Sequence, residues 1–194
     1  MPQKIGVLAL QGDFAKHQAM LQLLKIETVL VKRPKDLHGC EGLIIPGGES
    51  TTLTKLIQKC NMYEPIREFT EKHPIMGTCA GAIMVASSVD DQRIEPLQLI
   101  DISVTRNAYG RQIDSFITHV EVPFLKGFAW FKTVFIRAPK IRNVGSQVEV
   151  LMELHGNPIM VQESNVLALT FHPELTSDPR IHQYFLERFL LFDL

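Results

Sequence analysis

The sequence has few cysteines, no excess of charge of either sign and no long apolar run. Its three cysteines, Cys40, Cys60 and Cys79, are scattered and form no CxxC pair. Such a set indicates neither a disulfide framework nor a cysteine zinc site, and free thiols suit the reducing cytoplasm. The formal net charge of −1 gives no electrostatic reason to bind nucleic acid or an anionic membrane.

Membrane-spanning length, internal repeats and linker-like stretches are also absent. No apolar segment approaches the roughly 20 residues that a membrane-spanning helix needs, so we expect no membrane anchor. The 194 residues are 45% hydrophobic and 21% charged, which is typical of an ordinary globular protein. We therefore expect a single domain over residues 1–194.

Short strand-like runs alternate with helix-like patterns along the chain. This alternation predicts an α/β fold, a mostly parallel open sheet with helices on both faces. The strand-rich stretch 115–163 predicts an antiparallel extension at one edge of that sheet. Strands are expected at 5–10, 28–31, 43–45, 75–76, 102–105, 115–122, 133–137, 148–153, 159–163 and 166–170, and helices at 14–25, 51–59, 65–72, 81–87 and 179–192.

Cys79 lies where an apolar strand is followed closely by a helix-like stretch. Gly77 and Gly81 flank it, and this pattern is typical of a sharp strand-to-helix turn with a nucleophile at its tip. The first amide groups of the helix favour the thiolate, which is the reactive form of cysteine. The alternative is a buried, unreactive cysteine at a strand end.

His172 ends a second apolar strand, and Glu174 follows two residues later. Residues two apart in an extended chain project to the same side, and Pro173 restricts the backbone between them. The pattern predicts that His172 takes the proton of Cys79 while Glu174 orients the imidazole. Alone, a His-Pro-Glu sequence would indicate a helix-capping histidine and a solvated glutamate.

The segment from Pro46 to Thr52 follows a third buried strand. Amide groups of its Gly47–Gly48 turn, with the amide of Ala80, can bind a developing oxyanion. The alternative is an ordinary strand-to-helix loop in which Ser50 or Thr51 caps the N-terminus of the next helix. A phosphate-binding loop is disfavoured because the Gly-Lys-Ser/Thr ending is missing.

These motifs all follow predicted strand ends, as does Gln11–Gly12. In open α/β sheets, ligands bind beyond the carboxyl ends of the strands, so we expect the motifs to share one site. Arg106 and Arg137 are candidate substrate groups, because a guanidinium matches an α-carboxylate. Without a ligand, each would be an ordinary surface ion pair.

Six segments occur together in the order of one known family. They are Gly6–Phe14, Pro46–Thr52, Gly77–Gly81, Arg106–Gln112, Phe135–Pro139 and His172–Leu175. Together they resemble the glutaminase subunits of pyridoxal 5′-phosphate synthase, which are class I (triad) glutamine amidotransferases with a flavodoxin-like sheet.

The resemblance implies hydrolysis of L-glutamine to glutamate and ammonia, with no metal or organic cofactor. It implies a separate synthase subunit, a β/α barrel, that receives the ammonia. It assigns catalysis to Cys79, His172 and Glu174. The residues that it places in the glutamine pocket are Gly47, Gly48, Glu49, Ala80, Arg106, Ile136 and Arg137.

Two other functions remain open at this point. One is the glutaminase subunit of another amidotransferase, such as imidazole-glycerol-phosphate synthase, although Ala80 and the segment Arg106–Gln112 count against it. The other is a non-catalytic regulatory subunit with a vestigial site, which ammonia release from glutamine would exclude.

Histidines outside the triad are predicted to have structural or surface positions. We expect His17 to be structural or interfacial, and the Gln11–Asp13 loop with the start of the following helix to contact the partner. His119 is expected to pack at a strand edge. The histidines expected at the surface are His38, His73, His155 and His182.

Overall fold

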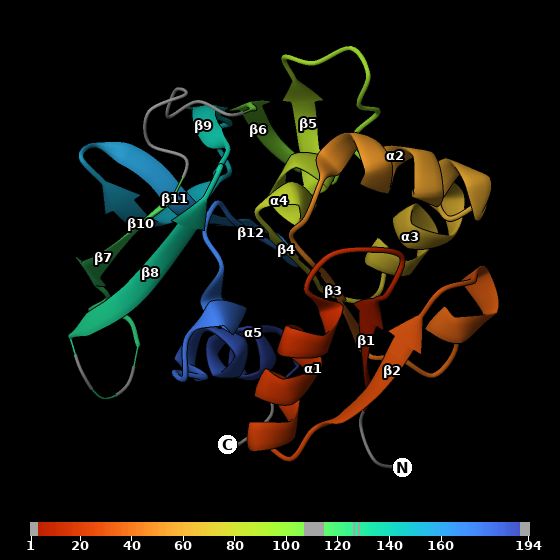
Figure 1. The fold of residues 1–194 in the computed structure, drawn as a ribbon, viewed down its shortest axis with the longest axis horizontal. Helices are drawn as coiled ribbons and strands as arrows, with labels where there is room; N and C mark the ends of the chain where they lie inside the picture. Colours follow the sequence, from red (N-terminus) through yellow and green to blue (C-terminus); the bar gives the residue numbers. More distant parts are fainter. Residues whose placement is uncertain (1–3, 107–114, 126, 128, 191–194) are drawn as a thin grey trace.

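The structure is a computed structural model that describes residues 4–106, 115–125, 127 and 129–190. Its elements alternate between strands and helices up to residue 85 and then become strand-rich (Figure 1). In chain order they are β1 (Lys4–Leu8), α1 (Phe14–Leu23), β2 (Glu27–Val31), η1 (Pro34–Leu37), β3 (Gly42–Ile45), α2 (Ser50–Lys59), α3 (Tyr63–Thr70), β4 (Ile75–Thr78), α4 (Ala80–Val85), β5 (Ala86–Val89), β6 (Ile100–Thr105), β7 (Ser115–Glu121), β8 (Trp130–Ile136), β9 (Lys140–Val144), β10 (Glu149–Leu154), β11 (Asn157–Glu163), β12 (Val166–Leu169), η2 (Pro173–Leu175) and α5 (Arg180–Leu190).

The central sheet has seven strands in the order β10-β11-β12-β4-β3-β1-β2. Five of them, from β12 to β2, pair in parallel, whereas β10 and β11 pair antiparallel beside β12. The predicted mostly parallel sheet and an antiparallel extension at its edge are therefore confirmed. Of the strands described in the stretch 115–163, however, only β10 and β11 join this sheet, because β7 and β8 form a two-stranded sheet and β9 pairs in a three-stranded sheet with β5 and β6. Strands β3, β4 and β12 are buried along their whole length, which explains why they read as continuous apolar runs.

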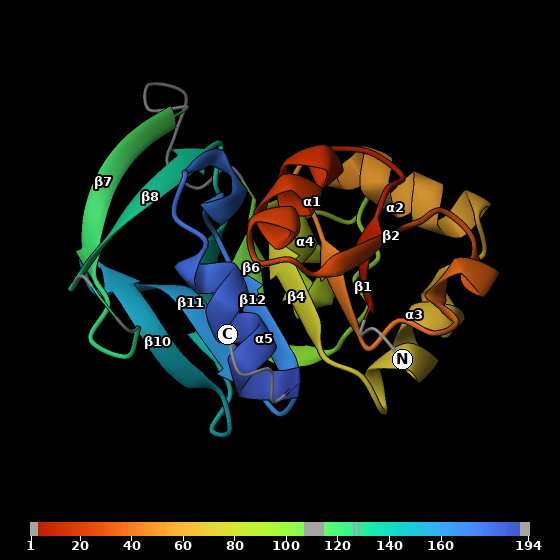
Figure 2. The same cartoon turned by 90° about the horizontal axis from the view of Figure 1, so that it is seen from below.

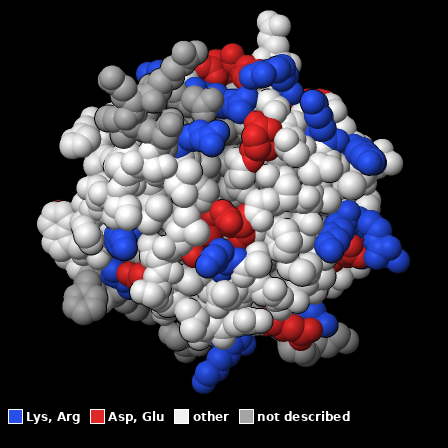
Figure 3. Space-filling view, viewed as in Figure 1, with Lys and Arg blue, Asp and Glu red and all other residues white. Residues whose placement is uncertain are grey.

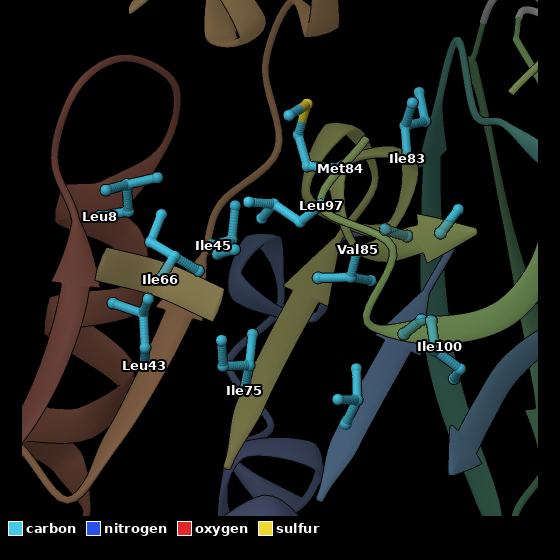
Figure 4. Packing of buried hydrophobic residues seen from close by; sticks show 14 of the residues in the cluster. Leu8, Leu43, Ile45, Ile66, Ile75, Ile83, Met84, Val85, Leu97 and Ile100 are labelled. Carbon is cyan, nitrogen blue, oxygen red and sulfur yellow. The ribbon is translucent and has the colours of Figure 1, made fainter. Parts of the chain in front are cut away.

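Helices cover both faces of this sheet, as predicted. On one face, β3 and β4 pack against α2, α3 and α4. Figure 4 shows Ile45 and Ile75 of the strands beside Ile66 of α3 and Val85 of α4. On the other face, Ile44 and Met76 pack with apolar residues of α1, α5 and β8. Figures 1 and 2 both show α1 and α5 as neighbours and the β7–β8 ribbon at the side of the molecule.

Two strands were not expected from the sequence. The helix predicted over 81–87 ends at Val85, because Ala86 begins β5 and pairs with Ile100 of β6. Strand β9 pairs antiparallel with β6 although its sequence is largely polar. Both strands form through pairing with β6, so tertiary contacts override their weak local patterns.

The surface carries both signs of charge. Figure 3 shows acidic and basic side chains scattered over one face without a stripe of one sign. Among the helices of the described residues, none is long and apolar enough to cross a membrane.

Candidate active site

Cys79 occupies the tip of the turn between β4 and α4. Its backbone has φ 50°, a left-handed conformation that is strained for a residue with a side chain. Its amide donates to the carbonyl of Leu169 on the neighbouring strand at 2.8 Å, which fixes the turn to the sheet. A Cβ on Gly81 would collide with the carbonyl oxygen of Ile45, so the helix approaches β3 too closely for any other residue. The predicted strand-to-helix turn is thus present.

His172 and Glu174 form a buried hydrogen-bonded pair. Nδ1 of His172 lies 2.7 Å from Oε1 of Glu174, and both side chains are almost completely buried. The sequence argument placed them on one side of an extended chain, and this was wrong. Pro173–Leu175 form a 3₁₀ turn, which folds the carboxylate back toward the imidazole. The amide of His172 also donates to the carbonyl of Val134 on β8 at 2.8 Å.

The His172 imidazole also interacts with the side chain of Cys79. Burial alone would lower the pKa of His172, but the hydrogen bonds and charges of Cys79 and Glu174 outweigh burial and raise that pKa. The imidazolium form is therefore favoured beside Cys79. A positive charge at this position stabilises a thiolate, which is the nucleophilic form of a cysteine.

The Gly47–Gly48 turn lies directly against these side chains. A Cβ on Gly47 would lie 2.5 Å from Cε1 of His172 and 3.2 Å from Cβ of Cys79, so only glycine allows this approach. Ala80, the first residue of α4, is adjacent in sequence to Cys79. The backbone groups of both segments therefore surround the thiol.

A cavity of about 360 Å³ opens over Cys79, and its size is that of a small-molecule pocket. The structure brings eight of the ten predicted site residues into its lining. The other two lie just behind it, since Gly47 contacts Cys79 and His172, and Glu174 is covered by His172. The complete lining is Asp13, Gly48, Glu49, Ser50, Cys79, Ala80, Ile83, Arg106, Ile136, Arg137 and His172.

Glu49 caps helix α2, a position that the sequence argument gave to Ser50 or Thr51. Its carboxylate accepts four hydrogen bonds from the amides and hydroxyls of Thr51 and Thr52. Burial raises the pKa of this carboxyl, but these bonds outweigh it and lower the pKa to about 2. Glu49 is therefore a fixed anion at the pocket wall.

Arg106 is held in the pocket wall by two carboxylates. Its Nη2 lies 2.7 Å from Oε1 of Glu49, and its Nη1 lies 2.8 Å from Oδ2 of Asp91. The sequence argument did not identify Asp91, because its only signal was an acidic pair in a loop. A guanidinium has five N–H donors, so the two ion pairs leave donors that can face a ligand.

Ile136 and Arg137 lie at the end of β8, opposite Cys79. The carbonyl oxygen of Ile136 is 3.8 Å from the sulfur of Cys79. Arg137 is exposed and has φ 42°, so this wall of the pocket, like the cysteine turn, contains a strained backbone residue.

Asp13 and Ser50 line the pocket but were not predicted as site residues. One carboxylate oxygen of Asp13 and one donor atom each of His172 and Glu174 lie within 4.8 Å of one another. These three side chains are the described group that would come closest to holding a metal ion. Within this group, Glu174 is bonded to Nδ1 of His172, which is the contact that orients the imidazole.

Two histidines outside the pocket are buried together, and one of them, His182, differs from its expected position. His182 was expected at the surface but is fully buried, and His17 is fully buried as well. They lie on α5 and α1 and contact each other through their ring nitrogens. His17 therefore cannot itself contact a partner, although its neighbour Lys16 is exposed.

Comparison with known proteins agrees with this geometry. Pyridoxal 5′-phosphate synthase subunit PdxT of Thermotoga petrophila is 48% identical over 185 residues, which cover 95% of this chain and 98% of the relative. The subunit of the same name from Dictyoglomus turgidum is 48% identical over 189 residues, with the same coverage. A crystal structure of a glutamine amidotransferase superimposes with a TM-score of 0.88 at 45% identity, covering 94% of this chain and 97% of that one. Since the model of the SNO glutamine amidotransferase family also matches residues 7–191, the chain belongs to that family.

Proposed function

We propose that this chain is the glutaminase subunit of a pyridoxal 5′-phosphate synthase, with one glutamine amidotransferase domain over residues 1–194. It hydrolyses L-glutamine and delivers ammonia to a separate synthase subunit. The observation that carries the proposal is the Cys79–His172–Glu174 arrangement at the base of a pocket in a chain of this family. The names of its relatives support the assignment to pyridoxal phosphate synthesis.

The first half of the reaction forms a thioester. The Cys79 thiolate attacks the side-chain amide carbon of glutamine, and the carbonyl oxygen becomes an oxyanion. Backbone amides of Ala80 and of the Gly47–Gly48 turn stabilise that charge. His172 then gives its proton to the departing nitrogen, which leaves as ammonia when the carbon–nitrogen bond breaks.

The second half releases glutamate. Neutral His172 takes a proton from water, and the resulting hydroxide attacks the thioester carbon. The carbon–sulfur bond breaks, glutamate leaves, and the thiolate and imidazolium are restored. Glu174 holds the imidazole by its Nδ1–H so that Nε2 faces the sulfur.

The remaining pocket residues recognise the amino-acid end of glutamine. We assign the α-carboxylate to Arg106 and Arg137, whose guanidinium groups match its geometry. Glu49 keeps Arg106 in place through their 2.7 Å ion pair and supplies negative charge near the α-amino group. Ile136 closes the pocket above Cys79.

The partner of this chain is expected to be a β/α-barrel synthase subunit, and the reaction is expected to occur in the cytoplasm. The three cysteines are free, which suits a reducing compartment. The partner is expected to contact the Gln11–Asp13 loop and the exposed start of α1.

Partner dependence follows from the flexibility of the oxyanion turn. Gly48 has φ 141°, and glycine at this position allows the peptide to reorient. Losing one oriented oxyanion donor costs on the order of 3 kcal/mol, roughly a hundredfold in rate. We therefore expect weak ammonia release by this chain alone and roughly hundredfold stimulation when a docked synthase subunit fixes the turn.

The experiment is a steady-state assay of glutamate and ammonia with and without the synthase subunit. Lys16→Glu, on the exposed start of α1, should reduce the stimulation, whereas Lys59→Glu, at the far end of α2, serves as the charge-matched control. No release of ammonia under either condition would refute glutaminase function. Equal rates with and without the partner would refute gating.

A further inference from the structure

A row of buried polar side chains continues behind Glu174, away from the pocket. Nε2 of His17 lies 3.4 Å from Oε2 of Glu174 and 3.2 Å from Oγ1 of Thr78. On its other side, Nδ1 of His17 lies 2.9 Å from Nε2 of His182. Helices α1 and α5 thus place two histidines behind the carboxylate of Glu174, and neither histidine takes part in the mechanism described above.

Both histidines are fully buried, and burial favours the neutral form of each ring. Burial lowers the pKa of His182 to about 3. For His17, burial is again the main cause of a strongly lowered pKa, and His182 and His172 lower it further. Each ring therefore carries one proton, on one of its two nitrogens.

The neighbours of the two rings decide which nitrogen carries that proton. The carboxylate oxygens of Glu174 only accept hydrogen bonds, so a proton on the facing Nε2 of His17 is favoured over a lone pair there. Oγ1 of Thr78, 3.2 Å from the same nitrogen, can accept that proton in a hydrogen bond. Nδ1 of His17 is then an acceptor, and Nε2 of His182 donates to it. In the opposite arrangement, a lone pair of His17 would face the carboxylate, and a buried N–H on Nδ1 of His182 would have no acceptor.

Glu174 needs such a donor on its second oxygen. Its Oε1 bonds to His172, but its Oε2 is buried and has no hydrogen-bond partner among the described residues. That oxygen lies 3.4 Å from Nε2 of His17, which is an electrostatic contact rather than a formed hydrogen bond. A buried carboxylate oxygen without a donor is costly, and a carboxylate held at one oxygen alone is free to turn.

We propose that His17 is a positioning residue whose Nε2–H faces Oε2 of Glu174 at 3.4 Å and steadies the carboxylate electrostatically, and that His182 fixes the tautomer of His17. The inference deepens the proposed function, because it concerns the orientation of the same triad. The carboxylate is held between His172 and His17, so the imidazole of His172 keeps Nε2 directed at Cys79.

A packing role would need no polar atoms at these positions. Apolar side chains of similar size would fill the space between α1 and α5 without the cost of burying two imidazoles. His17 and His182 instead lie behind Glu174, where an oriented N–H group can hold its carboxylate in place.

The test measures kcat, KM and the pH profile of glutamine hydrolysis by the full chain with its synthase subunit. The variants are His17→Leu, which removes the donor, His17→Gln, which keeps an N–H donor at a similar reach, and His182→Leu, which frees the tautomer of His17. Leu186→Ala, also buried on α5, is the control for lost stability without a lost polar group.

For His17→Leu we expect kcat to fall about tenfold with little change in KM, as loss of a buried hydrogen-bond donor produces. The alkaline limb of the pH profile should move to lower pH, because the hydrogen bond to Glu174 helps to raise the pKa of His172, and a carboxylate that is free to turn supports the imidazolium less. The titratable groups near Glu174 are His172, His17 and Asp13, with Cys79 and His182 one contact further away. His17→Gln should restore most of kcat and the original profile, and His182→Leu should be intermediate.

The inference is overturned if His17→Leu behaves like Leu186→Ala, with an unchanged pH profile. If His17→Leu does not fold, His17→Gln and His182→Leu decide the matter, and a wild-type profile in His182→Leu refutes the role of the pair. A wild-type complex that releases no ammonia would refute the proposed function itself, and the inference with it.

Discussion

Replacing Cys79 by serine or alanine abolishes glutamine hydrolysis and leaves the fold intact; this is the largest effect that we expect. The thiol lies in the pocket between His172 and the oxyanion turn, and neither substitution leaves a nucleophile of comparable reactivity. Loss of a triad nucleophile removes a factor of at least about a thousand from kcat. The strained φ of 50° is already occupied by a residue with a Cβ, so the substitutions add little backbone strain.

The measurement is ammonia release by the complex with its synthase subunit, together with thermal unfolding of each variant. Cys60→Ser is the control, because Cys60 lies at the end of α2 and does not line the pocket. If Cys79→Ala kept more than a small fraction of wild-type kcat, another residue would have to form the thioester.

The second large effect is expected for His172→Asn. Asparagine cannot take the proton of Cys79 or give one to ammonia, so turnover should fall almost as far as in Cys79→Ala. Residues that act as a unit are not additive, and the double variant should therefore be no slower than either single one.

Glu174→Ala should be less severe, because it removes the residue that orients the imidazole and leaves the nucleophile and base in place. Steady-state kcat of all three variants in the activated complex gives the ranking. Full kcat in Glu174→Ala would remove Glu174 from the mechanism, despite its 2.7 Å bond to His172.

The sequence predicted those features that depend on local pattern. The apolar runs of β3, β4 and β12 reflect burial on both faces of the sheet. A short continuous apolar run can be recognised from the local sequence alone. The cysteine turn was likewise predictable, because Gly81 is required by a close approach of backbone to backbone.

Features that depend on pairing between distant segments were not predictable. Strand β9 exists because β6 supplies its partner. Asp91 supports the pocket because it forms an ion pair with Arg106 of the pocket wall, and an acidic loop residue gives no signal of such a pairing. His17 and His182 are 165 residues apart, and the sequence around each one indicates only an ordinary helix residue.

The central claim is that Cys79 is the nucleophile of a glutamine-specific pocket, and covalent labelling tests it most directly. The complex is incubated with a glutamine-derived diazo-ketone, with and without excess glutamine, and the modified peptides are identified by mass spectrometry. Burial raises the pKa of the Cys40 thiol to about 11, so little thiolate exists there, and Cys60 lies outside the pocket. We predict labelling of Cys79 that glutamine prevents, with Cys40 and Cys60 unmodified. Label found mainly on Cys40 or Cys60, or labelling of Cys79 that glutamine does not reduce, would contradict the account.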